Sequence, residues 1–91
     1  MGGLVLMKSC CNDEFWECFQ SLPERVQKQA NLAYQRFKQD PYYPSLHFKC
    51  IDPKWQIYSA RVGRGYRAVG RMINEEILWF WIGTHEEYNH F

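Results

Sequence analysis

The chain has 91 residues, of which 46% are hydrophobic and 18% aromatic, enough for one small domain with a single core; this composition excludes a disordered polypeptide. Its formal net charge of +1 conceals a strong asymmetry. Residues 45–74 hold six basic side chains and one acidic side chain, whereas residues 75–91 hold four acidic side chains and neither lysine nor arginine. This distribution predicts one surface that faces anions and excludes a uniformly basic protein.

The stretch LVLMKSC, residues 4–10, predicts a short first strand. Its apolar run is too short for a signal peptide or a membrane span, so we expect a cytoplasmic protein without membrane association. Met7 can serve as an alternative start, which would make residues 1–6 an extension of a single domain over residues 1–91. The cysteines lack the spacing of a zinc site, so we expect reduced structural thiols and neither a metal nor a small-molecule cofactor. They are Cys10, Cys11, Cys18 and Cys50.

Two helices are predicted next. The stretch NDEFWECFQSL, residues 12–22, offers Asn12 or Asp13 as an N-cap and repeats its apolar residues at helical spacing. A second helix over roughly residues 23–39 follows a capping box of Ser21 and Glu24 and ends at DPYYP. Its apolar stripe consists of Val26, Ala30, Ala33 and Phe37.

The rest of the chain predicts strands, because the stretches SLHFKCI, WQIYSARV, YRAVGRMI and ILWFWIG alternate or are strongly apolar. The turns DPK, GRG and NEE separate them, and we expect GRG to be a three-residue hairpin loop. The order of one strand, two helices and three or four antiparallel strands predicts an α+β fold with a helical hairpin packed on one sheet face.

The stretch RVGRGYRAVGR, residues 61–71, contains four arginines and no acidic residue. Its glycine spacing is GxGxxxxG and no helix follows, which excludes a nucleotide-binding loop. With GRG as a three-residue loop, Arg61 lies opposite Arg67, and like charges in that relation are unfavourable unless an anion lies between them. If NEE is also a three-residue loop, Gly65 lies opposite His85, and the three basic side chains share one sheet face; a two-residue loop at either turn would break this arrangement. The alternative is a solvated arginine face without a ligand.

Several blocks together resemble the RelE/ParE superfamily of bacterial toxins: LPERVQKQANLAYQRF, PSLHFK, YSARVGRGYRAVG and WFWIGTHEEY. The resemblance covers about residues 7–91. It implies a two-helix hairpin against a curved antiparallel sheet, a cognate antitoxin protein as partner, and, in the RelE-like branch, cleavage of mRNA in the ribosomal A site. The ParE-like branch implies the alternative, a non-enzymatic toxin that inhibits DNA gyrase.

The resemblance also implies four catalytic residues. Arg67 matches the arginine that RNA-cutting members use on the scissile phosphate, and Arg61 stands where they have a basic residue on the preceding strand. His85 falls at the position of a catalytic arginine or histidine, and Tyr88 close to a C-terminal tyrosine. Ser59 and Arg61 stand where some members have a lysine pair. The further side chains expected to bind RNA are Lys49, Arg64 and Arg71.

These residue types suit cleavage of RNA by its own 2′-hydroxyl, which needs a base, cations around the phosphate and an acid for the leaving oxygen. His85 can take either proton-transfer role, and arginines can clamp phosphate in a bidentate manner. Tyr88 is a possible acid, a stacking ring or a packing residue. Trp79 and Trp81 are expected on the His85 face, where they would either stack RNA bases or pack in the core.

Overall fold

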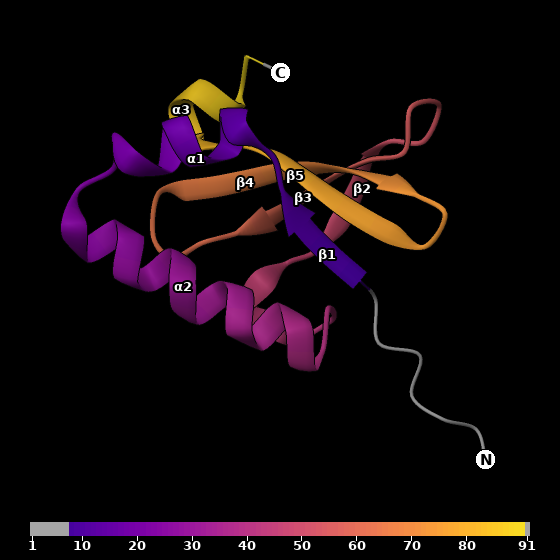
Figure 1. The fold of residues 1–91 in the computed structure, drawn as a ribbon, viewed down its shortest axis with the longest axis horizontal. Helices are drawn as coiled ribbons and strands as arrows, with labels where there is room; N and C mark the ends of the chain where they lie inside the picture. The colour runs from indigo at the N-terminus through magenta and orange to yellow at the C-terminus, as the bar shows by residue number, and fades with distance from the viewer. Residues whose placement is uncertain (1–7, 91) are drawn as a thin grey trace.

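The computed structural model describes residues 8–90, which form a helical hairpin and a five-stranded sheet (Figure 1). The sheet order is β1-β5-β4-β3-β2, so the C-terminal strand β5 lies inside the sheet, between β1 and β4. The elements are β1 Lys8–Cys11, α1 Asp13–Gln20, α2 Glu24–Gln39, the 3₁₀ helix η1 Pro44–Leu46, β2 Lys49–Asp52, β3 Ile57–Arg61, β4 Tyr66–Ile73, β5 Glu76–Thr84 and α3 His85–Tyr88.

The predicted α+β class and the helical hairpin are confirmed, and β2 to β5 form four antiparallel strands. The sheet has five strands and not three or four, because the first strand joins it: Lys8–Cys11 pairs in parallel with residues 76–79 of β5. The topology permits parallel pairing, because the helical hairpin and three strands separate β1 from β5 and no tight turn constrains their direction. Residues 4–7 of the predicted first strand lie outside the described residues.

The helix ends show which capping predictions hold. Asn12 is the N-cap of α1, and its Oδ1 accepts a hydrogen bond from the Phe15 N–H at 2.9 Å. The predicted capping box of Ser21 and Glu24 was wrong. The N-cap of α2 is Pro23, which has no side-chain cap, and the Ser21 hydroxyl instead donates to the Glu17 carbonyl at 3.3 Å.

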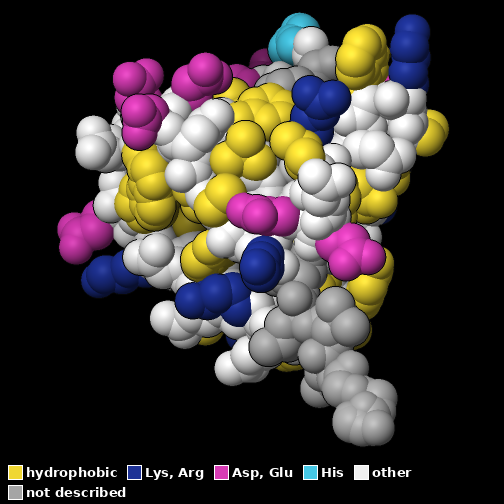
Figure 2. All heavy atoms as spheres, turned by 45° about the vertical axis from the view of Figure 1, so that its right-hand side comes forward, with side chains coloured by type: hydrophobic (Ala, Val, Ile, Leu, Met, Phe, Trp, Pro, Cys, Tyr) yellow, Lys and Arg dark blue, Asp and Glu magenta, His cyan; other side chains and the backbone are white. Residues whose placement is uncertain are grey.

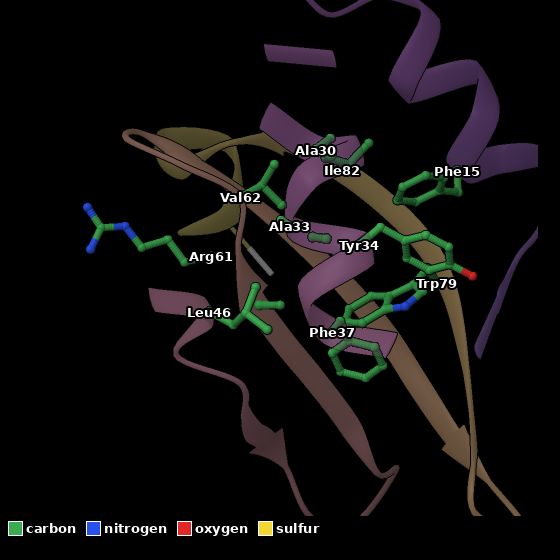
Figure 3. A pocket seen from close by; sticks show the side chains of 12 residues that line it. Phe15, Ala30, Ala33, Tyr34, Phe37, Leu46, Arg61, Val62, Trp79 and Ile82 are labelled. Atoms are coloured by element: carbon green, nitrogen blue, oxygen red, sulfur yellow. The ribbon is translucent and has the colours of Figure 1, made fainter. Parts of the chain in front are cut away.

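The core lies between the helices and one sheet face. Val26, Ala30 and Phe37 of α2 are buried as the apolar stripe predicts, while Ala33 is partly buried. The predicted strand over residues 45–51 is shorter, because η1 occupies its start and turns Leu46 into the core with only 2% exposure. An apolar cavity remains between α2 and the sheet, and Figure 3 shows Tyr34, Phe37 and Trp79 around it.

A short turn and a β-bulge together set the register between β4 and β5, and their effects on the register cancel. The turn at NEE has two residues, because Ile73 pairs with Glu76, so the condition of a three-residue loop at NEE is not met. Asn74 and Glu75 both have positive φ, 50° and 66°, as a type I′ turn requires. The register then shifts by one residue at a bulge, so that Gly70 pairs with Trp79 but Val69 pairs with Trp81. The bulge restores the register that the short turn removes.

The same bulge separates the two tryptophans. Trp79 is 4% exposed and packs edge-on against Phe37 of α2, in the core. Trp81 pairs with Val69, and its indole lies against Gly83, where an added Cβ would be 2.5 Å from the Trp81 Cζ2 atom. The prediction that both tryptophans share the His85 face therefore fails for Trp79.

Candidate functional site

The arginine pair lies where the hairpin geometry predicts. Arg61 pairs with Arg67 across β3 and β4, and the Val62 N–H donates to the Tyr66 carbonyl at 3.0 Å to close the GRG loop. Gly63 and Gly65 in this loop have φ of 102° and 81°, a conformation that favours glycine.

A hollow of about 370 Å³ opens at this end of the sheet. We call it the arginine hollow; it is lined by Arg61, Gly63, Gly65, Tyr66, Arg67 and His85. The predicted convergence of the two arginines and the histidine is thus present. Figure 3 shows the Arg61 side chain pointing away from the apolar cavity, so its charge lies outside the core.

Arg67 is held from one side by an aromatic ring. Its guanidinium carbon lies 5.7 Å from the centre of the Tyr88 ring, within the range of a cation–π contact. Its Nη1 is buried without a hydrogen-bond partner among residues 8–90. A buried N–H donor that lacks a partner costs free energy, so a bound anion at this atom would be stabilising.

His85 is fixed by its backbone. Its N–H donates to the Gly65 carbonyl at 2.7 Å, which joins the start of α3 to the GRG loop. Thr84 and Glu87 form a capping box: the Thr84 Oγ1 accepts from the Glu87 N–H at 3.1 Å, and the Thr84 N–H donates to the Glu87 carboxylate at 3.0 Å. The backbone bond from Thr84 lowers the pKa of the Glu87 carboxyl, so the cap is charged at neutral pH. His85 itself is exposed, with an imidazole free to reach solvent.

Tyr88 connects the histidine to the sheet. Its ring centre lies 5.8 Å from that of His85, and its hydroxyl donates to the Ser59 Oγ at 3.2 Å. Ser59 is fully buried, at 0% exposure, in the middle of β3. Tyr88 therefore contacts His85, Arg67 and Ser59 together, and its orientation influences both basic side chains of the hollow.

The remaining predicted basic residues do not line the arginine hollow. Lys49 lies on the edge strand β2, paired with Ser59, and Arg64 is exposed in the GRG loop. Arg71 lies further along β4, paired with Ile57, and its guanidinium carbon is 5.8 Å from the centre of a Trp55 ring. A role of these three in RNA binding remains a prediction.

The predicted set of site residues did not include Ser59, although the structure joins it to Tyr88 by a hydrogen bond. The sequence signal was present, because this residue stands where some members of the superfamily that the sequence resembles have a lysine.

The remaining chemistry of the described part is limited. Among residues 8–90 there is no group of three or more His, Cys, Asp or Glu side chains that could hold a metal ion. The four cysteines are free, and burial raises the pKa of Cys11 to about 11, which keeps that thiol protonated at neutral pH. None of the helices within the described range has the length and apolarity to cross a membrane.

Figure 2 shows a side of the molecule that exposes acidic side chains as well as basic and hydrophobic ones. The arginine hollow differs, because Arg61, Arg67 and His85 are basic and no acidic residue lines it. This hollow is the place where the basic middle segment of the sequence can face an anion.

A helical hairpin on one face of a five-stranded sheet, with an arginine pair and a histidine at one end of that sheet, is the class of fold that the resemblance to the RelE/ParE superfamily implies. The chain belongs to the ParE-like toxin domain family, whose model matches residues 24–90. The predicted resemblance is confirmed. No curated protein matches the sequence significantly.

Three solved structures illustrate the likeness. The RelB–RelE antitoxin–toxin complex from Methanococcus jannaschii has a TM-score of 0.70 at 16% identity, over 89% of this chain and 96% of the other. The RelBE2 toxin–antitoxin complex from Mycobacterium tuberculosis has a TM-score of 0.69 at 18% identity, over 89% and 100%. The YoeB/ParE toxin from Agrobacterium tumefaciens has a TM-score of 0.65 at 16% identity, over 87% and 99%. At these identities the likeness shows the fold.

Proposed function

We propose that this chain is the toxin of a type II toxin–antitoxin pair and cleaves mRNA in the ribosomal A site without a metal ion. The observation that carries the proposal is the arginine hollow, in which two opposed arginines and a histidine line the same space. A like-charged pair directly opposed on a sheet is unfavourable by itself, and a phosphate between the two guanidinium groups would offset the repulsion.

Each residue has a role in this mechanism. The RNA 2′-hydroxyl attacks the neighbouring phosphorus while the bond to the 5′-oxygen breaks, giving a 2′,3′-cyclic phosphate and a free 5′-hydroxyl. Arg61 and Arg67 stabilise the charge that builds on the phosphate oxygens. His85 transfers a proton at the attacking or the leaving oxygen. Tyr88, held by Ser59, orients Arg67 and His85, and its hydroxyl is the second candidate for proton transfer.

The proposal includes a partner and a place of action. A cognate antitoxin is expected, since the family is one of toxin domains and two of the similar structures are toxin–antitoxin complexes. The described chain acts as a single toxin domain over residues 1–91, in the cytoplasm where ribosomes translate. Lys49, Arg64 and Arg71 would bind RNA outside the arginine hollow.

The experiment is primer extension on mRNA after induction of the toxin, with a matched reaction in which purified protein meets the same RNA with and without ribosomes. We expect discrete cuts that depend on ribosomes and that His85→Ala abolishes. Naked RNA should be cut poorly, because a hollow with one histidine relies on the ribosome to place the 2′-hydroxyl in line. Equal cutting of naked RNA would contradict the dependence on ribosomes.

The second candidate function is inhibition of DNA gyrase, which the ParE-like description of the family favours. A supercoiling assay with purified gyrase distinguishes the two. Loss of supercoiling, together with intact mRNA in cells that express the toxin, would overturn the cleavage proposal in favour of this one.

A further inference from the structure

A second groove adjoins the arginine hollow on the side of α2. It has a volume of about 400 Å³ and lies between α2, η1 and the GRG loop. We call it the helix groove. Its lining includes Leu32, Ala33 and Leu46 as an apolar part and Arg36 and Arg61 as a basic part. None of the lining residues is acidic.

The two spaces share residues. Arg61 and Gly63 line both the helix groove and the arginine hollow. The wall between α2 and the loop is tight, because a Cβ added to Gly63 would lie 2.8 Å from the Gln29 Oε1 atom. A ligand that fills the hollow and extends past Arg61 therefore enters the helix groove.

Arg36 is placed for a ligand of this kind. Its guanidinium carbon lies 5.2 Å from the centre of the Tyr43 ring, which holds the cation at the groove and leaves its N–H groups for an anion. Tyr43 is 42% exposed and Leu32 48% exposed, so an aromatic ring and an aliphatic side chain flank the cation at the surface. Single-stranded nucleic acids bind to surfaces that combine cations with aromatic or apolar contacts for the bases.

We propose that the helix groove binds a nucleotide of single-stranded RNA adjacent to the phosphate in the arginine hollow, with Arg36 on its phosphate and the apolar part against its base or ribose. This inference rests on the proposed function. The volume lies within the range of small-ligand sites, about 300–1,000 Å³, and the lining provides positive charge without an acidic residue. An acidic protein segment would also complement the positive charge of the groove, so the experiment must distinguish binding of such a segment from binding of RNA.

The experiment measures the binding of fully 2′-O-methylated RNA, which cannot be cleaved, as a dinucleotide and as a hexanucleotide. The wild type should bind the hexanucleotide more tightly, because the dinucleotide has a single phosphate, for the arginine hollow, and only the longer ligand has a further phosphate for Arg36. Arg36→Ala should lose about fivefold of hexanucleotide affinity, as one partly exposed ion pair contributes, and bind the dinucleotide unchanged. The slope of log K against log salt should become shallower by about 0.7, the value for one phosphate on a single strand.

Two further variants sharpen the test. Leu32→Asp puts a negative charge into the helix groove at a half-exposed helical position, and it should weaken hexanucleotide binding in the same direction. Arg25→Ala removes an arginine from the same helix that is exposed and lines neither space, and it should leave the salt slope unchanged.

Two outcomes would overturn the inference. One is that Arg36→Ala and Arg25→Ala bind the hexanucleotide equally. The other is that Arg36→Ala weakens binding of poly-glutamate and not of the hexanucleotide, which would assign the groove to an acidic protein segment. Neither outcome depends on cleavage, whereas the cleavage proposal fails separately if His85→Ala still cuts mRNA.

Discussion

Replacement of Arg67 by alanine tests the arginine hollow most directly, because its effects on stability and on catalysis differ. Removal of the like-charged pair with Arg61 should stabilise the sheet by up to about 1 kcal/mol. Removal of the buried, unpartnered Nη1 should stabilise it by roughly a further 1–3 kcal/mol. The lost cation–π contact with Tyr88 costs about 0.5–2 kcal/mol.

Arg67 is partly buried, and the loss of its aliphatic part opposes the gain. We therefore expect the free energy of unfolding to change by no more than about 1 kcal/mol, which shifts the melting temperature by about 4–8 °C at most. Cleavage should fall by about 10²–10³-fold, the usual loss when one donor to transition-state charge is removed.

The assay combines thermal unfolding followed by circular dichroism with primer extension in the presence of ribosomes. Arg25→Ala is the matched control, since it removes an exposed arginine outside both spaces. Cleavage by Arg67→Ala within a few-fold of the wild type would refute the role of this residue. A melting temperature that falls by much more than 8 °C, with activity lost in parallel, would make Arg67 a structural residue instead.

Three other outcomes are expected. Ser59→Ala and Tyr88→Phe should each slow cleavage. The double variant should cleave no more slowly than the slower single variant, because both substitutions remove the same hydrogen bond. A loss of rate in the double variant equal to the product of the two single losses would contradict this. Gly70→Ala should lower stability by about 1–3 kcal/mol in chemical denaturation, since its Cβ would lie 2.9 Å from a backbone carbonyl oxygen; an unchanged midpoint would show that the bulge yields. The pKa of Glu87 is depressed in the folded protein, so its cap stabilises α3 above the unfolded pKa of the carboxyl, and this stability is lost as the pH falls through the folded pKa. In melting temperatures measured over a pH series, Glu87→Gln should lack this acid-dependent loss. The same pH dependence in the variant and the wild type would contradict the role of the Glu87 carboxylate.

The hairpin around GRG shows what the sequence makes predictable. Glycines on both sides of Arg64 require a loop with positive φ, and the alternation of the flanking strands then places Arg61 opposite Arg67. The apolar stripe of α2 was also predictable, because apolar residues at helical spacing lie on one face of the helix and that face is the one that becomes buried. Both features are determined by residues that are close together in the sequence.

The turn and the bulge between β4 and β5 were not predictable in this way. Asn74 and Glu75 form a two-residue turn with positive φ although neither is glycine, so the local signal for its length was weak. The bulge lies in the run WFW. This run contains no polar residue, so the sequence does not show that the residues after the bulge point to the opposite side of the sheet from the one that strict alternation predicts. The two errors offset each other, and the position of His85 opposite Gly65 was predicted correctly for an incomplete reason.

The contact of Tyr88 with Ser59 was also beyond prediction, since it joins residues that are 29 positions apart and depends on how α3 packs on the sheet. The spacing of residues in the sequence predicts which helix or strand a residue belongs to and on which face of that element it lies. It does not place the short terminal helix that follows the last strand.

The interior position of β5, between β1 and β4, has a consequence for synthesis of the protein. This strand is the last of the sheet to be translated, yet it pairs with β1 and β4 and leads directly into α3, which carries His85 and Tyr88. A nascent chain that lacks these residues cannot complete the sheet or assemble the arginine hollow. Until β5 is available, β1 has no strand to pair with and the β4 edge stays open.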